Sequence, residues 1–260
     1  CFVYIIAAYK YVNRKLMGQN MHLAILVTNT DQSSFAEQHP RDAEKFTDLI
    51  HLARPEWQIS AFEVHLGEFP ARIEEFDGVM LTGSPASTRS GLPWIAQLLD
   101  LIRQMEQQKQ PQFGACFGHQ ACALALGGEI SANPQGWVHG LVKNQLIRRP
   151  AWASRLPQNF GLYGSHCEYV SKLPPEAEET AQSNGQNAGF RIGTHLWTSQ
   201  HHPEMSHGFI SALTEEMRDA LGPQCHAAAL ESLSRGANQA EFAESLACFF
   251  EQAAAARPRP

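Results

Sequence analysis

The chain has 260 residues, 43 % of them hydrophobic, and a formal charge of −6 at pH 7. This length and apolar content permit one large domain with a well-buried core. The acidic balance disfavours nucleic acid as a partner, because duplex binding usually needs a basic patch that displaces counterions. No run of the sequence reaches the roughly 18–20 apolar residues that cross a bilayer, so we expect a soluble protein without a membrane partner.

The first twenty residues differ from the rest in charge. They carry the three cations Lys10, Arg14 and Lys15 and no acidic residue, so the formal charge without them changes from −6 to −9. Met21 stands directly before an apolar run that is typical of the first strand of an α/β domain. We therefore expect residues 1–20 to be a non-native or disordered extension, and residues 21–260 to form a single domain.

The six cysteines are scattered and show no C-x-x-C spacing, which argues against both a disulfide framework and a structural zinc site. They are Cys1, Cys116, Cys122, Cys167, Cys225 and Cys248. Free thiols of this kind fit a reducing compartment. We therefore expect a cytoplasmic protein.

In chain order, the first half alternates between short β-branched runs and helical periodicity. Strands are expected at 22–28, 58–64, 77–82 and 111–115, and helices at about 41–53, 92–109 and 118–127. This alternation predicts an α/β fold with a doubly wound, mostly parallel sheet flanked by helices.

Beyond Gly127 and Gly128 the pattern changes to strands without a long helix between them. These strands are expected at roughly 138–147, 166–172, 188–193 and 195–200, and we expect them to form a small antiparallel extension. Helical periodicity returns from about residue 206, with helices at about 206–220, 225–234 and 238–256.

Cys116 lies between two glycines at the point where an apolar strand passes into a helix. A side chain on such a turn projects from the backbone, and the N-terminus of the following helix favours the thiolate. This is the environment that a nucleophilic thiol needs. Taken alone, a cysteine at a strand end is more often a packed core residue.

Two further strand ends carry polar groups, and ligands of a doubly wound sheet bind beyond the carboxyl ends of its strands. One strand leads into Gly83, in a loop whose N–H groups can face an anion, although the same residues are also compatible with a plain turn. The other leads to His202 and Glu204, which are separated by Pro203. The proline restricts the backbone between them, so that Glu204 can reach back to the imidazole and hold its tautomer.

Together these strand ends supply the groups of a thiol acyl-transfer site. Cys116 is the predicted nucleophile, His202 the base that takes its proton, and Glu204 the carboxylate that orients the base. The N–H groups of Phe117 and Gly83 are the predicted donors to the oxyanion.

A metal site is a competing interpretation of the cluster of His195, His201, His202 and His207. No carboxylate or thiol has suitable spacing to complete such a site, so we expect neither a metal nor a cofactor. His201 is interpreted as a pocket wall or strand-end residue rather than as the base. Cys167 is interpreted as a packed strand residue rather than as a second reactive thiol.

The motif GACFGHQ at 114–120, followed by the histidine of QHHPE at 200–204, resembles the class I (triad) glutamine amidotransferase family. The segments 81–87, 93–95, 126–128, 133–137 and 165–166 resemble its free-standing branch, which is similar to the glutaminase domain of GMP synthase. The resemblance spans about residues 22–204 and implies a flavodoxin-like class I glutamine amidotransferase fold.

The resemblance also implies a reaction. A γ-glutamyl amide, of glutamine or of a similar small molecule, would be hydrolysed through a γ-glutamyl thioester on Cys116, with release of ammonia or an amine. Gln120, Ser165 and His166 match the family positions that hold the glutamyl group. The chain departs from the family pattern at His201, where an aromatic residue is usual, at 167–168, where Gly-Asp is common, and at 88–91.

Three functions remain open on the sequence: a glutaminase subunit that supplies ammonia to a separate synthetase, an independent γ-glutamyl peptide hydrolase, and a non-catalytic regulatory relative. Residues 205–260 contain no Gly-rich phosphate loop with a lysine, so we do not expect this chain to complete an amination alone. The presence of Cys116, His202 and Glu204 argues against the regulatory relative. The sequence does not indicate an oligomeric state.

Overall fold

Five parallel strands form one half of the central sheet in the computed structural model, which describes residues 20–257. In spatial order they are β2 (Gln58–Phe62), β1 (His22–Leu26), β3 (Gly78–Leu81), β4 (Gln112–Ala115) and β11 (Leu196–Ser199). The strand expected at 195–200 in the antiparallel extension joins the two halves of the sheet. Trp197 pairs with Arg191 in antiparallel register, as expected, but it also pairs with Phe113 in parallel register, which was not expected. As a result, the carboxyl ends of β3, β4 and β11 meet at one edge of the sheet.

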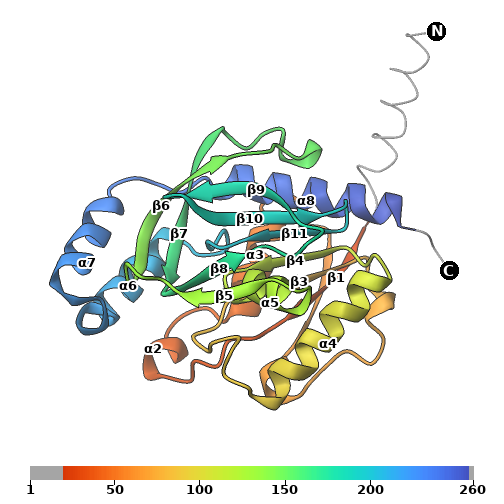
Figure 1. Ribbon diagram of the computed structural model, residues 1–260, viewed down its shortest axis with the longest axis horizontal. Coiled ribbons are helices and arrows are strands. Elements are labelled where there is room, and N and C mark those ends of the chain that lie inside the picture. The colour runs from red at the N-terminus through yellow and green to blue at the C-terminus, as the bar shows by residue number, and fades with distance from the viewer. Residues whose placement is uncertain (1–19, 258–260) are drawn as a thin grey trace, which may run out of the picture.

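The other half of the same sheet is antiparallel (Figure 1). It continues from β11 through β10 (Gln186–Ile192), β9 (Glu178–Ser183), β6 (Val138–Leu146) and β7 (Asn159–His166). A separate antiparallel pair joins β5 (Glu129–Ala132) to β8 (Glu168–Lys172). The sequence pattern did not predict β5, β7 or β9, because these strands are short, polar or interrupted by glycine.

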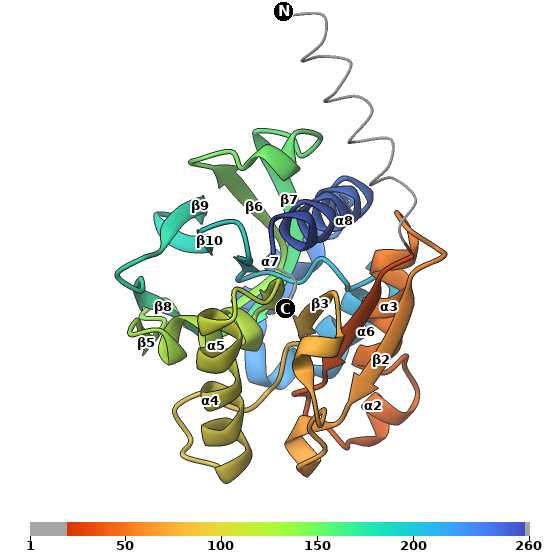
Figure 2. The same cartoon turned by 90° about the vertical axis from the view of Figure 1, so that its right-hand side faces the viewer.

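Helices cover both faces of the sheet, and different helices lie on each face (Figure 2). The helices are α2 (Ser34–Glu37), α3 (Asp42–His51), α4 (Pro93–Gln107), α5 (Phe117–Ala125), α6 (His207–Glu216), α7 (Arg218–Ser232) and α8 (Gln239–Ala256), with 3-10 turns at Val64–Leu66, Ile73–Glu75 and Ala151–Ala153. Side chains of α3 and α8 pack into one hydrophobic cluster, and those of α4 and α5 into another. The expected α/β class is confirmed, whereas the four-residue helix α2 was not predicted.

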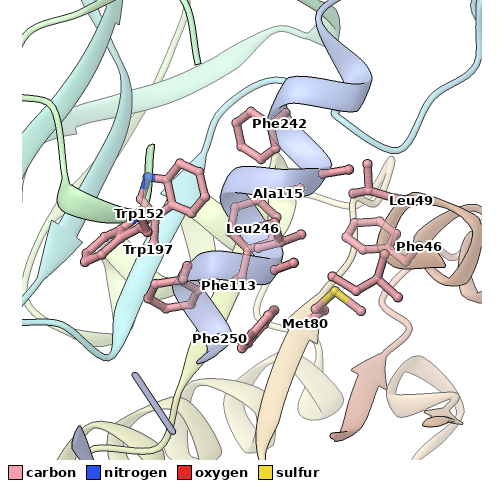
Figure 3. Packing of buried hydrophobic residues seen from close by; sticks show 14 of the residues in the cluster. Phe46, Leu49, Met80, Phe113, Ala115, Trp152, Trp197, Phe242, Leu246 and Phe250 are labelled. Atoms are coloured by element: carbon pink, nitrogen blue, oxygen red, sulfur yellow. The ribbon is translucent and has the colours of Figure 1, made fainter. Parts of the chain in front are cut away.

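The C-terminal helix α8 supplies much of the core on its face of the sheet (Figure 3). Phe242, Leu246 and Phe250 follow one another at intervals of four residues, so they lie on the same side of the helix. The ring of Phe242 stacks on that of Trp197 from β11, with 4.9 Å between ring centroids and 12° between ring planes. The helix thereby fixes the strand that leads to the QHHPE segment.

The described chain begins at the edge of this core. Met21 is buried, and its carbonyl accepts a hydrogen bond from the Gln58 N–H at 2.8 Å. The extension expected for residues 1–20 lies outside the described residues except for Asn20. Among residues 20–257, no helix combines the length and the apolar composition that a membrane crossing needs.

Replacement of Phe242 by Ala tests the contribution of α8. Because Phe242 is fully buried and stacked on Trp197, we expect the free energy of unfolding to fall by about 3–5 kcal/mol in urea titrations. Leu52, which is 59 % exposed, is the control, and its replacement by Ala is expected to cost less than about 0.5 kcal/mol. Equal losses for the two variants would contradict this description of the core.

Candidate active site

Cys116 occupies a strained turn between β4 and α5. Its φ of 49° and ψ of −103° are rarely adopted by a residue with a side chain. Its N–H donates to the Ser199 carbonyl of β11 at 2.8 Å, and its carbonyl accepts from the Gln120 N–H of α5 at 3.0 Å. Such a conformation costs on the order of 1–3 kcal/mol and persists only where the surroundings hold it. Here the neighbouring strand and helix do so.

The glycines on either side of Cys116 allow the backbones of β3, β4 and α5 to approach one another. A Cβ at Gly114 would lie 2.5 Å from the Gly118 carbonyl carbon, and a Cβ at Gly118 would lie 2.6 Å from the Leu81 oxygen. Both distances are too short for any side chain. The Gly118 N–H also donates to the Thr82 carbonyl at 3.1 Å, which ties the start of α5 to the end of β3.

His202 and Glu204 form a buried pair after β11. The imidazole Nδ1 lies 2.6 Å from Glu204 Oε1, and the His202 N–H donates to the Tyr163 carbonyl at 2.8 Å. Burial lowers the pKa of His202, but the Glu204 carboxylate and the neighbouring Cys116 sulfur outweigh this effect and raise it well above its usual range. Within residues 20–257, Nε2 has no hydrogen-bond partner. One nitrogen is thus oriented by the carboxylate, while the other is left to accept or donate a proton.

Backbone N–H groups of Gly83 and Phe117 are available next to this pair. Within the described part of the chain, neither group donates a hydrogen bond. A Cβ at Gly83 would lie 2.7 Å from His202 Cε1 and 3.8 Å from Cys116 Cβ, so only glycine fits there. The Thr28 hydroxyl donates to the Gly83 carbonyl at 2.9 Å and holds the loop in place.

The three residues expected to hold a glutamyl group have different environments. Gln120 Nε2 and His166 Nδ1 both donate to the backbone carbonyl of Glu168, at 3.0 and 2.9 Å. Both side chains are buried. Ser165 instead lies on the wall of a cavity of about 650 Å³ that also contains Cys116 and His202.

Glu168 has a structural role that the sequence did not indicate. Its carboxylate accepts hydrogen bonds from the Ser87 hydroxyl at 2.9 Å and from the Arg89 guanidinium. It thereby connects β8 to the segment that follows Gly83. The two segments in which the sequence departs from the family pattern, 88–91 and 167–168, are therefore in contact with each other.

His201 has a hydrogen-bond partner other than a carboxylate, which argues against a role of His201 as the base. Its Nδ1 lies 2.7 Å from Asn144 Oδ1 of β6, and both side chains are buried. Burial, and after it the positive charge that neighbouring histidines can carry, lower the pKa of His201 well below its usual value. The imidazole is therefore neutral near pH 7. His201 does not line the cavity, so of its two interpretations the strand-end residue fits its position two residues after β11.

The remaining histidines of the cluster and Cys167 have environments of their own. Among residues 20–257, no three His, Cys, Asp or Glu side chains are grouped to hold a metal ion. His195 contacts Glu106, and His207 contacts the Tyr163 hydroxyl. Cys167 is exposed between β7 and β8, so its interpretation as a packed strand residue is wrong.

The fold and these groups define a class: an α/β protein with a cysteine on a strand-to-helix turn, next to a buried histidine–carboxylate pair. Comparisons with known proteins agree with this class. The family described as glutamine amidotransferase class-I matches residues 54–214, which is more than half of the chain. The chain therefore belongs to the class I glutamine amidotransferase family.

Individual relatives are similar to the chain in sequence, and a solved structure is similar to it in fold. Gamma-glutamyl peptidase 3 of Arabidopsis thaliana is 27 % identical over 211 residues, covering 78 % of this chain and 84 % of the relative. A subunit of the glutamine-hydrolysing GMP synthase of Methanosarcina mazei is 31 % identical over 136 residues, covering 52 % of this chain and 67 % of the relative. The crystal structure of a glutamine amidotransferase from Thermotoga maritima has the same fold, with a TM-score of 0.72, 18 % identity, and coverage of 91 % of this chain and 99 % of that chain.

Buried neutral histidines make the stability of the protein sensitive to acid. Burial lowers the pKa of His119 to about 3 and those of His139 and His166 to about 4. The unfolded chain binds these protons near pH 6.5, so unfolding takes up protons between about pH 6.5 and pH 4. The free energy of unfolding is expected to fall in that range by about 1.4 kcal/mol per pH unit for each such histidine.

Urea titrations at several pH values between 7 and 4.5 measure this slope. In the variant His139→Gln one of the titrating groups is absent, so the slope is expected to decrease by about one proton. A slope that His139→Gln leaves unchanged would show that folding does not lower the pKa of His139.

Proposed function

We propose that this protein hydrolyses γ-glutamyl amides through a γ-glutamyl thioester on Cys116. The observation that carries the proposal is the buried His202–Glu204 pair next to the strained Cys116 turn. One nitrogen of the imidazole is bound to the carboxylate at 2.6 Å, and the other has no hydrogen-bond partner among residues 20–257. This is the relation of nucleophile, base and orienting group that acyl transfer requires.

The reaction follows from these positions. His202 takes the Cys116 proton, and the sulfur attacks the amide carbon, while the oxyanion accepts hydrogen bonds from the Phe117 and Gly83 N–H groups. The C–N bond then breaks, and His202 gives its proton to the departing nitrogen. Water, deprotonated by His202, attacks the thioester, which releases glutamate and restores the Cys116 thiol.

The glutamyl part of the substrate is proposed to contact Gln120, Ser165 and His166. Gln120 and His166 share the Glu168 carbonyl as a partner, so the strand turn that carries this carbonyl holds both side chains in place. Glu168 is in turn fixed by Ser87 and Arg89. Substrate recognition would thus depend on β8 and the segment after Gly83 together.

Two versions of this function differ in the leaving group, which is either ammonia or a larger amine. A relative named as a subunit of GMP synthase supports hydrolysis of glutamine with transfer of ammonia to a separate synthetase. A relative named as a γ-glutamyl peptidase supports independent hydrolysis of a larger γ-glutamyl compound. The cavity of about 650 Å³ beside Cys116 favours the second version, because ammonia needs no such space.

Turnover of γ-glutamyl compounds is the direct test. We expect release of ammonia or amine from at least one member of a panel that contains L-glutamine and several γ-glutamyl amides. Cys116→Ala is expected to abolish both turnover and the acyl-enzyme detected by intact-protein mass spectrometry. Its far-UV circular dichroism should match that of the wild type. If no panel member reacts and a thiol-directed glutamine analogue does not label Cys116, the proposal fails.

The roles of the two histidines are tested by comparing three variants. His202→Ala removes the base, whereas Glu204→Gln only disturbs its orientation, so we expect Glu204→Gln to lose about 100-fold less kcat than His202→Ala. His201→Phe should lose less kcat/KM than His202→Ala, because Asn144 already occupies the Nδ1 of His201. A loss in His201→Phe as large as in His202→Ala would assign the base to His201 instead.

A further inference from the structure

The cavity beside Cys116 extends well beyond the reacting groups. It contains Cys116, Gly83 and His202 and reaches the unexpected helix α2 and the helix α6. These two helices are distant in sequence but lie side by side in both views (Figures 1 and 2). Phe35 of α2 and Phe209 of α6 contact each other there, with 5.9 Å between their ring centroids.

The position of His202 indicates which part of a substrate this cavity would hold. In the proposed reaction His202 protonates the departing nitrogen, so the leaving group must lie on the His202 side of Cys116. Of the three predicted glutamyl contacts, Ser165 lines the cavity, whereas Gln120 and His166 do not. The cavity is also lined by His202, and most of its wall, including Phe35 and Phe209, belongs to none of the predicted glutamyl contacts. We therefore assign the part near Ser165 to the glutamyl group and the remainder to the leaving group.

The volume of the cavity exceeds what ammonia requires. A water molecule, which is similar in size to ammonia, takes up about 30 Å³ in the liquid. The cavity of about 650 Å³ falls within the range typical of pockets for larger organic ligands. A leaving group with a sizeable body would fill it.

Aromatic side chains line part of the cavity. Phe35, His39 and Phe209 form a cluster, with centroid distances of 4.3 Å between Phe35 and His39 and 5.5 Å between His39 and Phe209. Trp137 lies on the cavity wall as well. Phe35, Phe209 and Trp137 are half-buried, so part of each ring remains free to pack against a ligand. Such walls favour aromatic or apolar groups.

The charges around the cavity disfavour a carboxylate on that ligand. The lining carboxylates are Asp31, Asp42, Glu63, Glu204 and Glu216, against the cations Arg41 and Lys45 and the His202 imidazole, whose pKa is raised. This leaves an excess of two negative charges with the other histidines neutral. Lys45 is not available to bind an anion, because its ammonium group is paired with Asp42 at 2.7 Å and lies 3.7 Å from the Phe209 centroid.

We propose that this cavity is a subsite for the leaving amine, and that it selects amines with an aromatic body and no carboxylate. Phe35 and Phe209 are its specificity-determining residues. The inference rests on the proposed function and adds to it the chemical class of the leaving group. In the step concerned, the thioester C–S bond forms, the amide C–N bond breaks, and the aromatic amine departs with the proton from His202.

Three substrates separate the contributions of the ring and the charge. They are L-glutamine, γ-glutamyl-phenethylamide and γ-glutamyl-phenylalanine, of which the last two differ only by a carboxylate. We expect kcat/KM for the phenethylamide to exceed that for glutamine and that for γ-glutamyl-phenylalanine by about tenfold or more each, because burial of the ring favours it and the acidic lining repels the carboxylate.

Variants test the assigned residues. Phe35→Ala is expected to lower kcat/KM for the phenethylamide by about tenfold more than for glutamine. Phe209→Ala should also lower the ratio of kcat/KM for the phenethylamide to kcat/KM for glutamine. It serves as an independent variant if changes in the short helix α2 disturb folding. Phe69→Ala is the matched control, since Phe69 is also half-buried but does not line the cavity, and this ratio should stay as in the wild type. Melting temperatures are measured for each variant.

The outcomes distinguish the two levels of the proposal. If glutamine is hydrolysed but the phenethylamide is not preferred, or if Phe35→Ala and Phe209→Ala lower both activities equally, the subsite assignment is wrong and the proposed function stands. A preference for γ-glutamyl-phenylalanine would overturn the exclusion of carboxylates. If the wild type hydrolyses none of the three compounds, the proposed function fails and the subsite assignment fails with it.

Discussion

The contact between the backbones of β3, β4 and α5 is the constraint on which the rest of the site depends. Gly114 and Gly118 have no room for a Cβ, since each would place it within 2.6 Å of backbone atoms. This contact forces Cys116 into its positive-φ turn and brings the N–H of Phe117, which has no acceptor in the described part of the chain, to the end of β4. The same contact joins α5 to the Thr82 carbonyl and so fixes the loop that presents Gly83.

A second set of interactions brings the base to this turn. The parallel pairing of β11 with β4 aligns Ser199 with Ala115, so the residues that follow both strands emerge at the same edge. Burial of Trp197 under Phe242 of α8 holds β11 in that register. The core and the site are therefore coupled through one strand, since its interior residue packs against the helix and its carboxyl end leads to His202.

Electrostatics divides five of the buried histidines into two groups. His202 faces a carboxylate at 2.6 Å and has a raised pKa, whereas His119, His139, His166 and His201 face neutral partners and have lowered pKa values. Their hydroxyl and amide partners, among them Thr198 and Asn144, can orient an imidazole without stabilising its charge. Among these five histidines only His202 has a carboxylate partner, so the carboxylate stabilises the protonated form at the position next to Cys116.

The sequence by itself determined the α/β class, most of the helices, and the three strand ends that carry Cys116, Gly83 and His202. These features are local: hydrophobic periodicity predicts α4 and α8, and glycine and proline mark the turns. Only the tertiary structure decided that β11 is parallel to β4, that β7 and β9 extend the sheet, and that Glu168 joins Ser87 and Arg89. It also decided that Phe35 and Phe209 share one cavity. Pairing of strands and contact between distant helices depend on packing over the whole chain, and no local pattern records them.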